Sequence, residues 1–187
     1  LIDFAIDYFE RLKRDYSSEK SRKTEIKIFD DVDVKKVVIR NTKLYVNREE
    51  GFIGTSLRRY EYVCDCSDID DIIIFTENCS MMVTKVDSKV FVGKNIVHVA
   101  VFKKKDLRTI YNMVYKDGDK GINFIKRFAV SGVTRDKMYK LSNSKKDSYV
   151  KYFSANPNGE AEKITINLRS NSKLKKLKWD VDFSEVI

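Results

Sequence analysis

This chain of 187 residues has little histidine, cysteine or proline. Its one histidine, His98, lies in the apolar run Ile96–Val99, so we expect it to be packed in a strand rather than to act as a base. The three cysteines, Cys64, Cys66 and Cys79, are an odd number and do not indicate a disulfide framework. With a single histidine beside them, they also do not form the pattern of a zinc site. The sequence therefore predicts no catalytic residue and no metal site.

Three further segments resemble ligand sites but lack essential parts. Asp30–Asp33 and Asp68–Asp71 are acidic, yet neither has the spacing or the closing glutamate of a calcium loop. Asp117–Gly121 resembles a phosphate-binding loop, but no Gly-Lys-Ser/Thr follows it. We interpret the acidic segments as turns that enter strands, and Asp117–Gly121 as a hairpin turn.

Long hydrophobic runs and a signal-peptide pattern are also lacking, which predicts a cytoplasmic protein with no membrane partner. The apolar content of 42% is nevertheless enough to build a core. The chain begins with Leu1 inside a patterned segment, which suggests a fragment of a longer polypeptide.

The periodicity of apolar residues changes near residue 24. Residues 1–16 place apolar side chains at helical spacing and predict an amphipathic helix, which the polar segment 17–21 ends. From Thr24 onward the pattern is nearly all β, beginning with short runs between Ile26 and Ile39. Further strands are expected at 60–66, 90–92, 96–102, 128–130 and 149–153.

One unit, a strand, a polar turn and a second strand, recurs four times. The paired strands are expected at 44–46 with 52–55, 72–75 with 81–85, 113–115 with 124–127, and 164–166 with 174–177. Repeated hairpins at spacings of tens of residues favour a propeller-like array of blades.

Positive charge is concentrated after residue 78. Residues 79–187 hold 23 lysines and arginines against 11 acids, a net +12, whereas residues 30–78 have a net −4. Because these cations are spread over many strands and loops, they favour binding to the phosphate backbone of a nucleic acid over a pocket for a small ligand. The candidates for DNA binding are Arg58, Arg59, Lys85, Lys103, Lys104, Lys105, Lys120, Lys126, Arg127, Arg135, Lys137, Lys140, Lys145, Lys146, Lys173, Lys175 and Lys176, with Lys89, Lys94, Arg169 and Lys178 in the wider set.

The charge partition places the expected DNA contact on the later hairpins, where Lys126, Arg127, Arg135, Lys137, Lys175 and Lys176 are expected to matter more than Arg58 and Arg59. The alternative is a propeller-like interaction scaffold whose positive face docks an acidic protein. Steep salt dependence without sequence preference favours DNA, and mild salt dependence favours a protein interface.

Several segments together resemble a known family. They are Arg22–Asp30 after the amphipathic helix, the turn Glu50–Leu57, and above all Tyr111–Gly118, Lys126–Phe128 and Gly132–Lys137. They resemble the C-terminal domain of the A subunit of bacterial topoisomerase IV, in the form found in Bacteroides-type bacteria, and the likeness covers nearly the whole chain.

The resemblance implies a mainly β fold, a β-pinwheel whose basic rim bends duplex DNA. Residues 1–23 would be a helix and linker from the upstream cleavage region, and residues 24–187 an incomplete pinwheel of about three to four blades. The implied partners are duplex DNA, the B subunit of topoisomerase IV and a second copy of the A subunit. ATP and Mg²⁺ would act elsewhere in the full enzyme, so the resemblance implies no cofactor and no catalysis in this fragment.

One departure from the family narrows the expected activity. Gyrase-type A subunits carry a glycine-rich basic box in their first blade, whereas here Leu57 is followed by Arg58–Asp65. We therefore expect decatenation and relaxation rather than active negative supercoiling.

Overall fold

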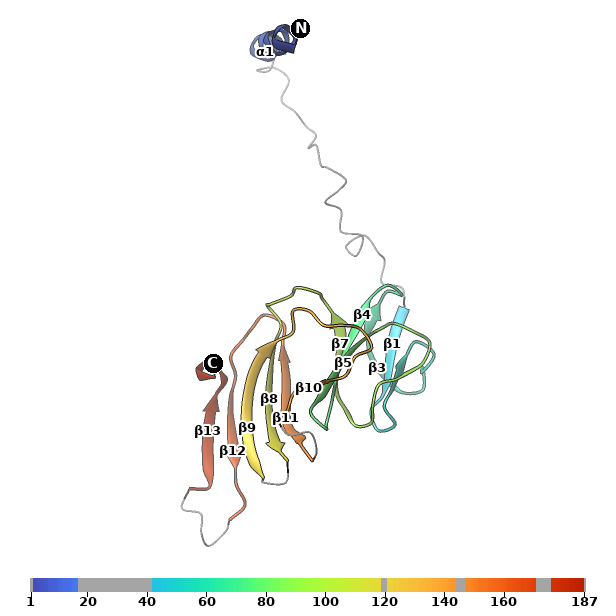
Figure 1. Cartoon of the computed structure of the whole chain (residues 1–187), viewed down its shortest axis with the longest axis vertical. Helices are drawn as coiled ribbons and strands as arrows, with labels where there is room; N and C mark the ends of the chain where they lie inside the picture. Colours follow the sequence, from blue (N-terminus) through green and yellow to red (C-terminus); the bar gives the residue numbers. More distant parts are fainter. Residues whose placement is uncertain (1, 17–41, 119–120, 144–146, 171–175, 187) are drawn as a thin grey trace. The chain divides into compact units, whose positions relative to one another are not determined.

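The computed structural model describes residues 2–16, 42–118, 121–143, 147–170 and 176–186. They belong to two units, an N-terminal helix and a β-rich part, and each is described by itself (Figure 1). The domain boundary expected after residue 23, the strands expected between Ile26 and Ile39, and the acidic segment Asp30–Asp33 lie outside the described residues.

The expected amphipathic helix is confirmed as α1 (Ile2–Tyr16). Asp3 in its first turn and Lys13 and Arg14 in its last turn complement the helix dipole. The side chains of its apolar stripe are exposed, from Ile2 at 77% to Leu12 at 37%. Within the described part of the chain, no helix is long and apolar enough to cross a membrane.

The described residues of the β-rich part form four antiparallel sheets. The first has the order β3-β1-β2-β6, formed by β3 (Glu61–Cys66), β1 (Thr42–Asn47), β2 (Phe52–Gly54) and β6 (Val90–Phe91). The second has the order β10-β5-β4-β7, formed by β10 (Tyr139–Lys140), β5 (Ser80–Lys85), β4 (Asp71–Thr76) and β7 (Ile96–Phe102).

The third and fourth sheets are smaller. The third has the order β11-β8-β9, formed by β11 (Tyr149–Asn156), β8 (Ile110–Asp117) and β9 (Ile122–Ala129). The fourth pairs β12 (Lys163–Asn167) with β13 (Lys178–Asp182), and a 3-10 helix, Phe183–Glu185, follows it.

Two short strands return to the preceding sheet. β6 follows β5 in the chain but pairs with β2 of the first sheet, and β10 follows β9 but pairs with β5 of the second. Gly54 permits the first return, because a Cβ there would lie 2.2 Å from the Ser88 carbonyl oxygen just before β6. Each exchanged strand therefore ties one sheet to the next.

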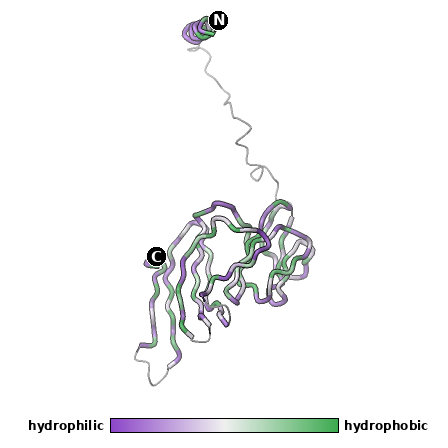
Figure 2. The backbone as a smooth tube through the Cα atoms, in the orientation of Figure 1, coloured by the Kyte–Doolittle hydropathy of each residue, from purple (hydrophilic) through white to green (hydrophobic). Residues whose placement is uncertain are grey.

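The core lies between neighbouring sheets and explains why β4 is apolar at successive positions. Ile72 and Ile74 pack with Leu44 and Val46 of the first sheet, while Ile73 and Phe75 pack with Tyr111 of the third sheet. A strand buried on both faces reads as a continuous hydrophobic run. Figure 2 shows this concentration of hydrophobic residues in the strands of the β-rich part.

Most of the expected strands are confirmed, and two were placed wrongly. The second strand of the fourth hairpin was expected at 174–177, but the strand that pairs with β12 is β13, Lys178–Asp182; residues 174 and 175 lie outside the described residues. The separate strand expected at 128–130 is the end of β9, which runs without a break from Ile122 to Ala129. β8 and β9 pair as a hairpin up to Asp117 and Ile122, as expected, while residues 119 and 120 of the turn between them lie outside the described residues.

Candidate nucleic-acid interface

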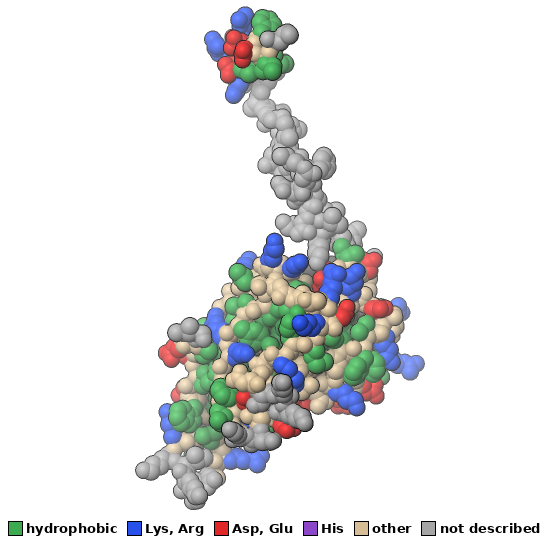
Figure 3. All heavy atoms as spheres, in the orientation of Figure 1, with side chains coloured by type: hydrophobic (Ala, Val, Ile, Leu, Met, Phe, Trp, Pro, Cys, Tyr) green, Lys and Arg blue, Asp and Glu red, His purple; other side chains and the backbone are tan. Residues whose placement is uncertain are grey.

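Lysine and arginine side chains are scattered over the visible face of the β-rich part and do not gather into one patch (Figure 3). Their contacts divide the candidates into two groups. Some donate to carbonyl or carboxylate groups of the protein itself, and others project into solvent. The second group is better placed to meet phosphates.

Two candidates on β9 form hydrogen bonds with other segments of the protein. Lys126 Nζ donates to the carbonyl oxygen of Leu141 at 2.7 Å. Arg127 donates from its two terminal nitrogens to the carbonyl oxygens of Gly159, at 3.0 Å, and Phe183, at 3.2 Å. Both side chains are half-buried. They remain predicted DNA contacts, but each already has a structural role.

Arg135 and Lys140 have similar internal partners. The guanidinium of Arg135 contacts both carboxylate oxygens of Asp71, at 2.8 and 3.1 Å, and so joins two segments 64 residues apart. Lys140 Nζ donates to the carbonyl oxygen of Asn78 at 3.1 Å.

Arg48, which the sequence did not single out, binds in the same way. It donates to the carbonyl oxygens of Ile96 and Val97 and forms an ion pair with Glu61 at 2.6 Å. The hydrogen bond and charge of Arg48 lower the pKa of the Glu61 carboxyl group.

The loop between β7 and β8 brings four cations close together in the sequence. Lys103, Lys104, Lys105 and Arg108 are all exposed on it, as expected for this segment. Such a loop offers several charges to successive phosphates.

Asp106 organises that loop. Its carboxylate accepts hydrogen bonds from the backbone N–H of Arg108 and the hydroxyl of Thr109, each at 2.8 Å, and these bonds lower its pKa. The N–H of Lys105, a residue with φ of 64°, donates to the carbonyl oxygen of Ser131 at 2.7 Å. The loop is therefore a defined structure before any ligand binds.

The remaining candidates are dispersed. Arg58 and Arg59 are exposed in the turn after β2, Lys85 is exposed at the end of β5, and Lys137 and Lys176 lie over the rings of Tyr139 and Trp179. Five candidates lie outside the described residues, namely Lys120, Lys145, Lys146, Lys173 and Lys175.

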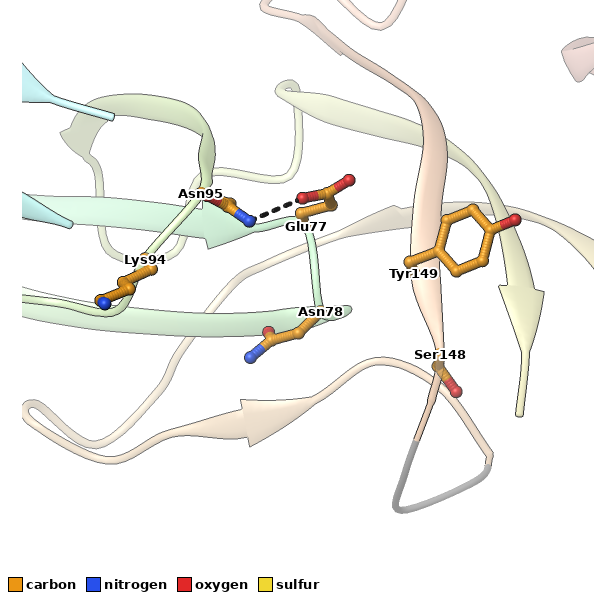
Figure 4. A pocket seen from close by; sticks show the side chains of 6 residues that line it. All are labelled: Glu77, Asn78, Lys94, Asn95, Ser148 and Tyr149. Carbon is orange, nitrogen blue, oxygen red and sulfur yellow. Dashed lines mark hydrogen bonds between the residues drawn. The ribbon is translucent and has the colours of Figure 1, made fainter. Parts of the chain in front are cut away.

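A shallow depression of about 550 Å³ contains another exposed cation, Lys94. Figure 4 shows Lys94 and Asn78 on one side and Ser148 and Tyr149 on the other, with Asn95 donating to the Glu77 carboxylate at 2.9 Å. The depression lies where the β4–β5 turn meets β11, and Val150 N–H donates to the Glu77 carbonyl there. The residues that line it include both the Lys94 ammonium and the Glu77 carboxylate, so its charge does not favour a phosphate.

His98 lies in β7 as expected and borders a separate cavity of about 270 Å³. Its ring is packed among Phe75, Tyr111 and Phe153, with centroids 5.5 to 6.1 Å away. Burial, reinforced by the charge of Arg48, lowers the pKa of His98 to about 4. The imidazole is therefore neutral at physiological pH and serves the packing between the second and third sheets.

The acidic segment Asp68–Asp71 and the three cysteines were expected to have structural roles. Asp70 accepts a hydrogen bond from the N–H of Ser67 at 2.9 Å, so the acidic segment is a turn at the start of β4. Cys64, Cys66 and Cys79 are thiols rather than disulfides, and burial raises the pKa of Cys79 to about 11. Over the described ranges, no group of three or more His, Cys, Asp or Glu side chains has metal-site geometry.

Comparison with known proteins agrees with the resemblance found in the sequence. The A subunit of DNA topoisomerase 4 from Borreliella burgdorferi is 32% identical over 155 residues, which are 82% of this chain and 24% of that protein. The chain thus spans about a quarter of the curated relative, and no solved structure matches it. Residues 43–187 match the model of the topoisomerase C-terminal domain of Bacteroidota, and by this match the chain belongs to that family.

Proposed function

We propose that the β-rich part binds and bends duplex DNA without base specificity, as the C-terminal domain of a type IIA topoisomerase A subunit. The observation that carries the proposal is the loop Lys103–Arg108, in which four exposed cations stand on a frame fixed by Asp106. Contacts to the phosphate backbone fix position without reading bases, so dispersed lysines suit a domain that accepts any duplex.

In this proposal the four sheets are blades of an incomplete β-pinwheel, and the exchanged strands β6 and β10 hold successive blades in a fixed orientation. The domain presents DNA to the cleavage region for ATP-dependent strand passage, which gives decatenation and relaxation. The B subunit and a second copy of the A subunit supply the remaining parts of the enzyme in the bacterial cytoplasm, near the nucleoid. This fragment itself performs no cleavage.

A salt titration tests DNA binding. Fluorescence anisotropy with a labelled duplex should give a Kd of about 10⁻⁴ to 10⁻⁶ M at physiological salt, with little dependence on sequence. The triple variant Lys103→Glu/Lys104→Glu/Lys105→Glu should bind more weakly. The slope of log affinity against log salt should become shallower by about 0.9 for each phosphate that the variant no longer neutralises.

The control is Arg58→Glu/Arg59→Glu, which changes two exposed cations in the turn between β2 and β3. The control should lose less affinity than the triple variant, also when the loss of each variant is divided by the number of cations it replaces. Undetectable binding of the folded wild-type chain at low salt would refute the proposal. A mild salt dependence together with tight binding of an acidic protein would favour the scaffold alternative.

A further inference from the structure

The loop Lys103–Arg108 also carries an exposed apolar side chain, that of Leu107. Leu107 is 67% exposed, more than any other large hydrophobic residue described between 42 and 186. Single exposed leucines are common on protein surfaces. This one differs because it stands between the exposed cations Lys103–Lys105 and Arg108, which the proposed function assigns to phosphate contacts.

The position of Leu107 is fixed by its neighbours. The Asp106 carboxylate accepts hydrogen bonds from Arg108 N–H and the Thr109 hydroxyl, which follow Leu107, and the Asp106 N–H donates to the carbonyl oxygen of Lys103 at 3.2 Å. Arg108 also reaches Asn158 Oδ1 at 3.4 Å. The leucine is thus held out on an ordered turn and needs little rearrangement to contact a ligand.

The corresponding connection between the first two sheets provides a comparison within the same chain. It runs from β3 to β4 as the basic loop runs from β7 to β8, and Asp70 orders it by accepting from Ser67 N–H. Its exposed aliphatic residue is Ile69, at 38% exposure, flanked by Asp68 and Asp70. Phosphates would be repelled there, so of these two loops the Leu107 loop alone combines an exposed apolar side chain with cations.

Resting on the proposed DNA binding, we propose that Leu107 is a wedge that enters the minor groove and partly unstacks one base step. The phosphates on either side of that base step would be bound by the four cations of the loop, Lys103, Lys104, Lys105 and Arg108. Apolar side chains inserted in this way kink a duplex toward the major groove, and flexible pyrimidine–purine steps yield most easily. The wedge would supply bending without base-specific contacts.

The experiment uses the full chain and a duplex of about 20 base pairs whose single pyrimidine–purine step carries 2-aminopurine, with a dye pair at the two ends. Anisotropy reports binding, 2-aminopurine fluorescence reports unstacking, and energy transfer reports bending. The wild-type chain should raise both the fluorescence and the energy transfer. Leu107→Ala should lose most of both signals, with affinity reduced by less than about tenfold because phosphate contacts dominate binding.

Two further variants make the test specific. Leu107→Met keeps a long apolar side chain and should retain both signals, while Ile69→Ala, the control in the acidic loop, should behave as the wild type. Unchanged signals in Leu107→Ala, or wild-type binding without unstacking, would overturn the wedge and leave DNA binding standing. A folded wild-type chain that does not bind at all would overturn the proposed function itself, and the anisotropy measurement identifies that case.

Discussion

Arg127 should contribute more to stability than to DNA binding. Its two terminal nitrogens join β9 to the carbonyl oxygens of Gly159, before β12, and Phe183, after β13. A hydrogen bond to a charged group contributes about 1.5–3 kcal/mol, so taking the lower value for a half-buried side chain gives about 3 kcal/mol for the pair. Arg127→Met keeps the aliphatic stem but removes both donors.

Thermal unfolding measures the effect. For a domain of this size, a loss of about 3 kcal/mol should lower the Tm by roughly 6–12 °C. Lys137→Met is the matched control, because that lysine is exposed and lies over the ring of Tyr139 without bridging distant segments. Its unfolding free energy should change by less than about 0.5 kcal/mol.

The same two variants separate the structural role from a DNA contact. At a temperature where both are folded, Arg127→Met should leave the salt slope of DNA binding close to that of the wild type. A Tm equal to that of the control, combined with a slope shallower by about 0.9, would refute this reasoning. Arg127 would then reach a phosphate, as the sequence predicted, and its bonds to the carbonyl groups would be dispensable.

Two other predictions concern packing between sheets. The pKa of His98 falls from 6.5 to about 4 on folding. Between these two values the unfolded chain binds a proton that the folded chain does not, so protonation favours unfolding. The free energy of unfolding should therefore be highest above pH 6.5 and should decrease toward pH 4. Urea titrations should show that the free energy of unfolding falls by up to about 3 kcal/mol over this pH range. His98→Phe should remove this part of the pH dependence, and identical pH profiles for the variant and the wild type would contradict the prediction. Gly54→Ala should cost about 1–3 kcal/mol, because its Cβ would collide with the Ser88 carbonyl and displace the segment entering β6. Hydrogen exchange should then accelerate at the amides of Thr55 and Ser56, which bond to Asp87 and Ser88, and unchanged protection would show that the returning strand is not held there.

Local sequence determined the helix, most strands and the ligand-like turns. Periodicity identified α1 because its apolar residues recur at helical spacing, and the alternation around polar turns identified the hairpins. The alternation of polar and apolar residues could not fix the register of the fourth hairpin. Both 174–177 and Lys178–Asp182 mix apolar and polar residues, and the choice depends on cross-strand pairs such as Ile164 with Val181 and Ile166 with Trp179.

The return of β6 and β10 to earlier sheets was likewise not predictable from the sequence. Each is a two-residue strand, and its partner is chosen by packing across the sheet, as where Gly54 lets the Ser88 segment approach. The sequence of a two-residue strand gives no information about which distant strand it will pair with. Tertiary contacts therefore decided how the hairpins are linked.

The sequence by itself determined the excess of positive charge and the family to which the chain belongs. It did not determine which cations are available to a ligand, because Lys126, Arg127 and Arg135 find their acceptors 15 to 64 residues away. Composition counts charges, whereas only the tertiary structure shows which are used for internal hydrogen bonds. In the loop Lys103–Arg108, by contrast, Asp106 accepts the local hydrogen bonds that order the turn, and the side chains of Lys103, Lys104, Lys105 and Arg108 are exposed.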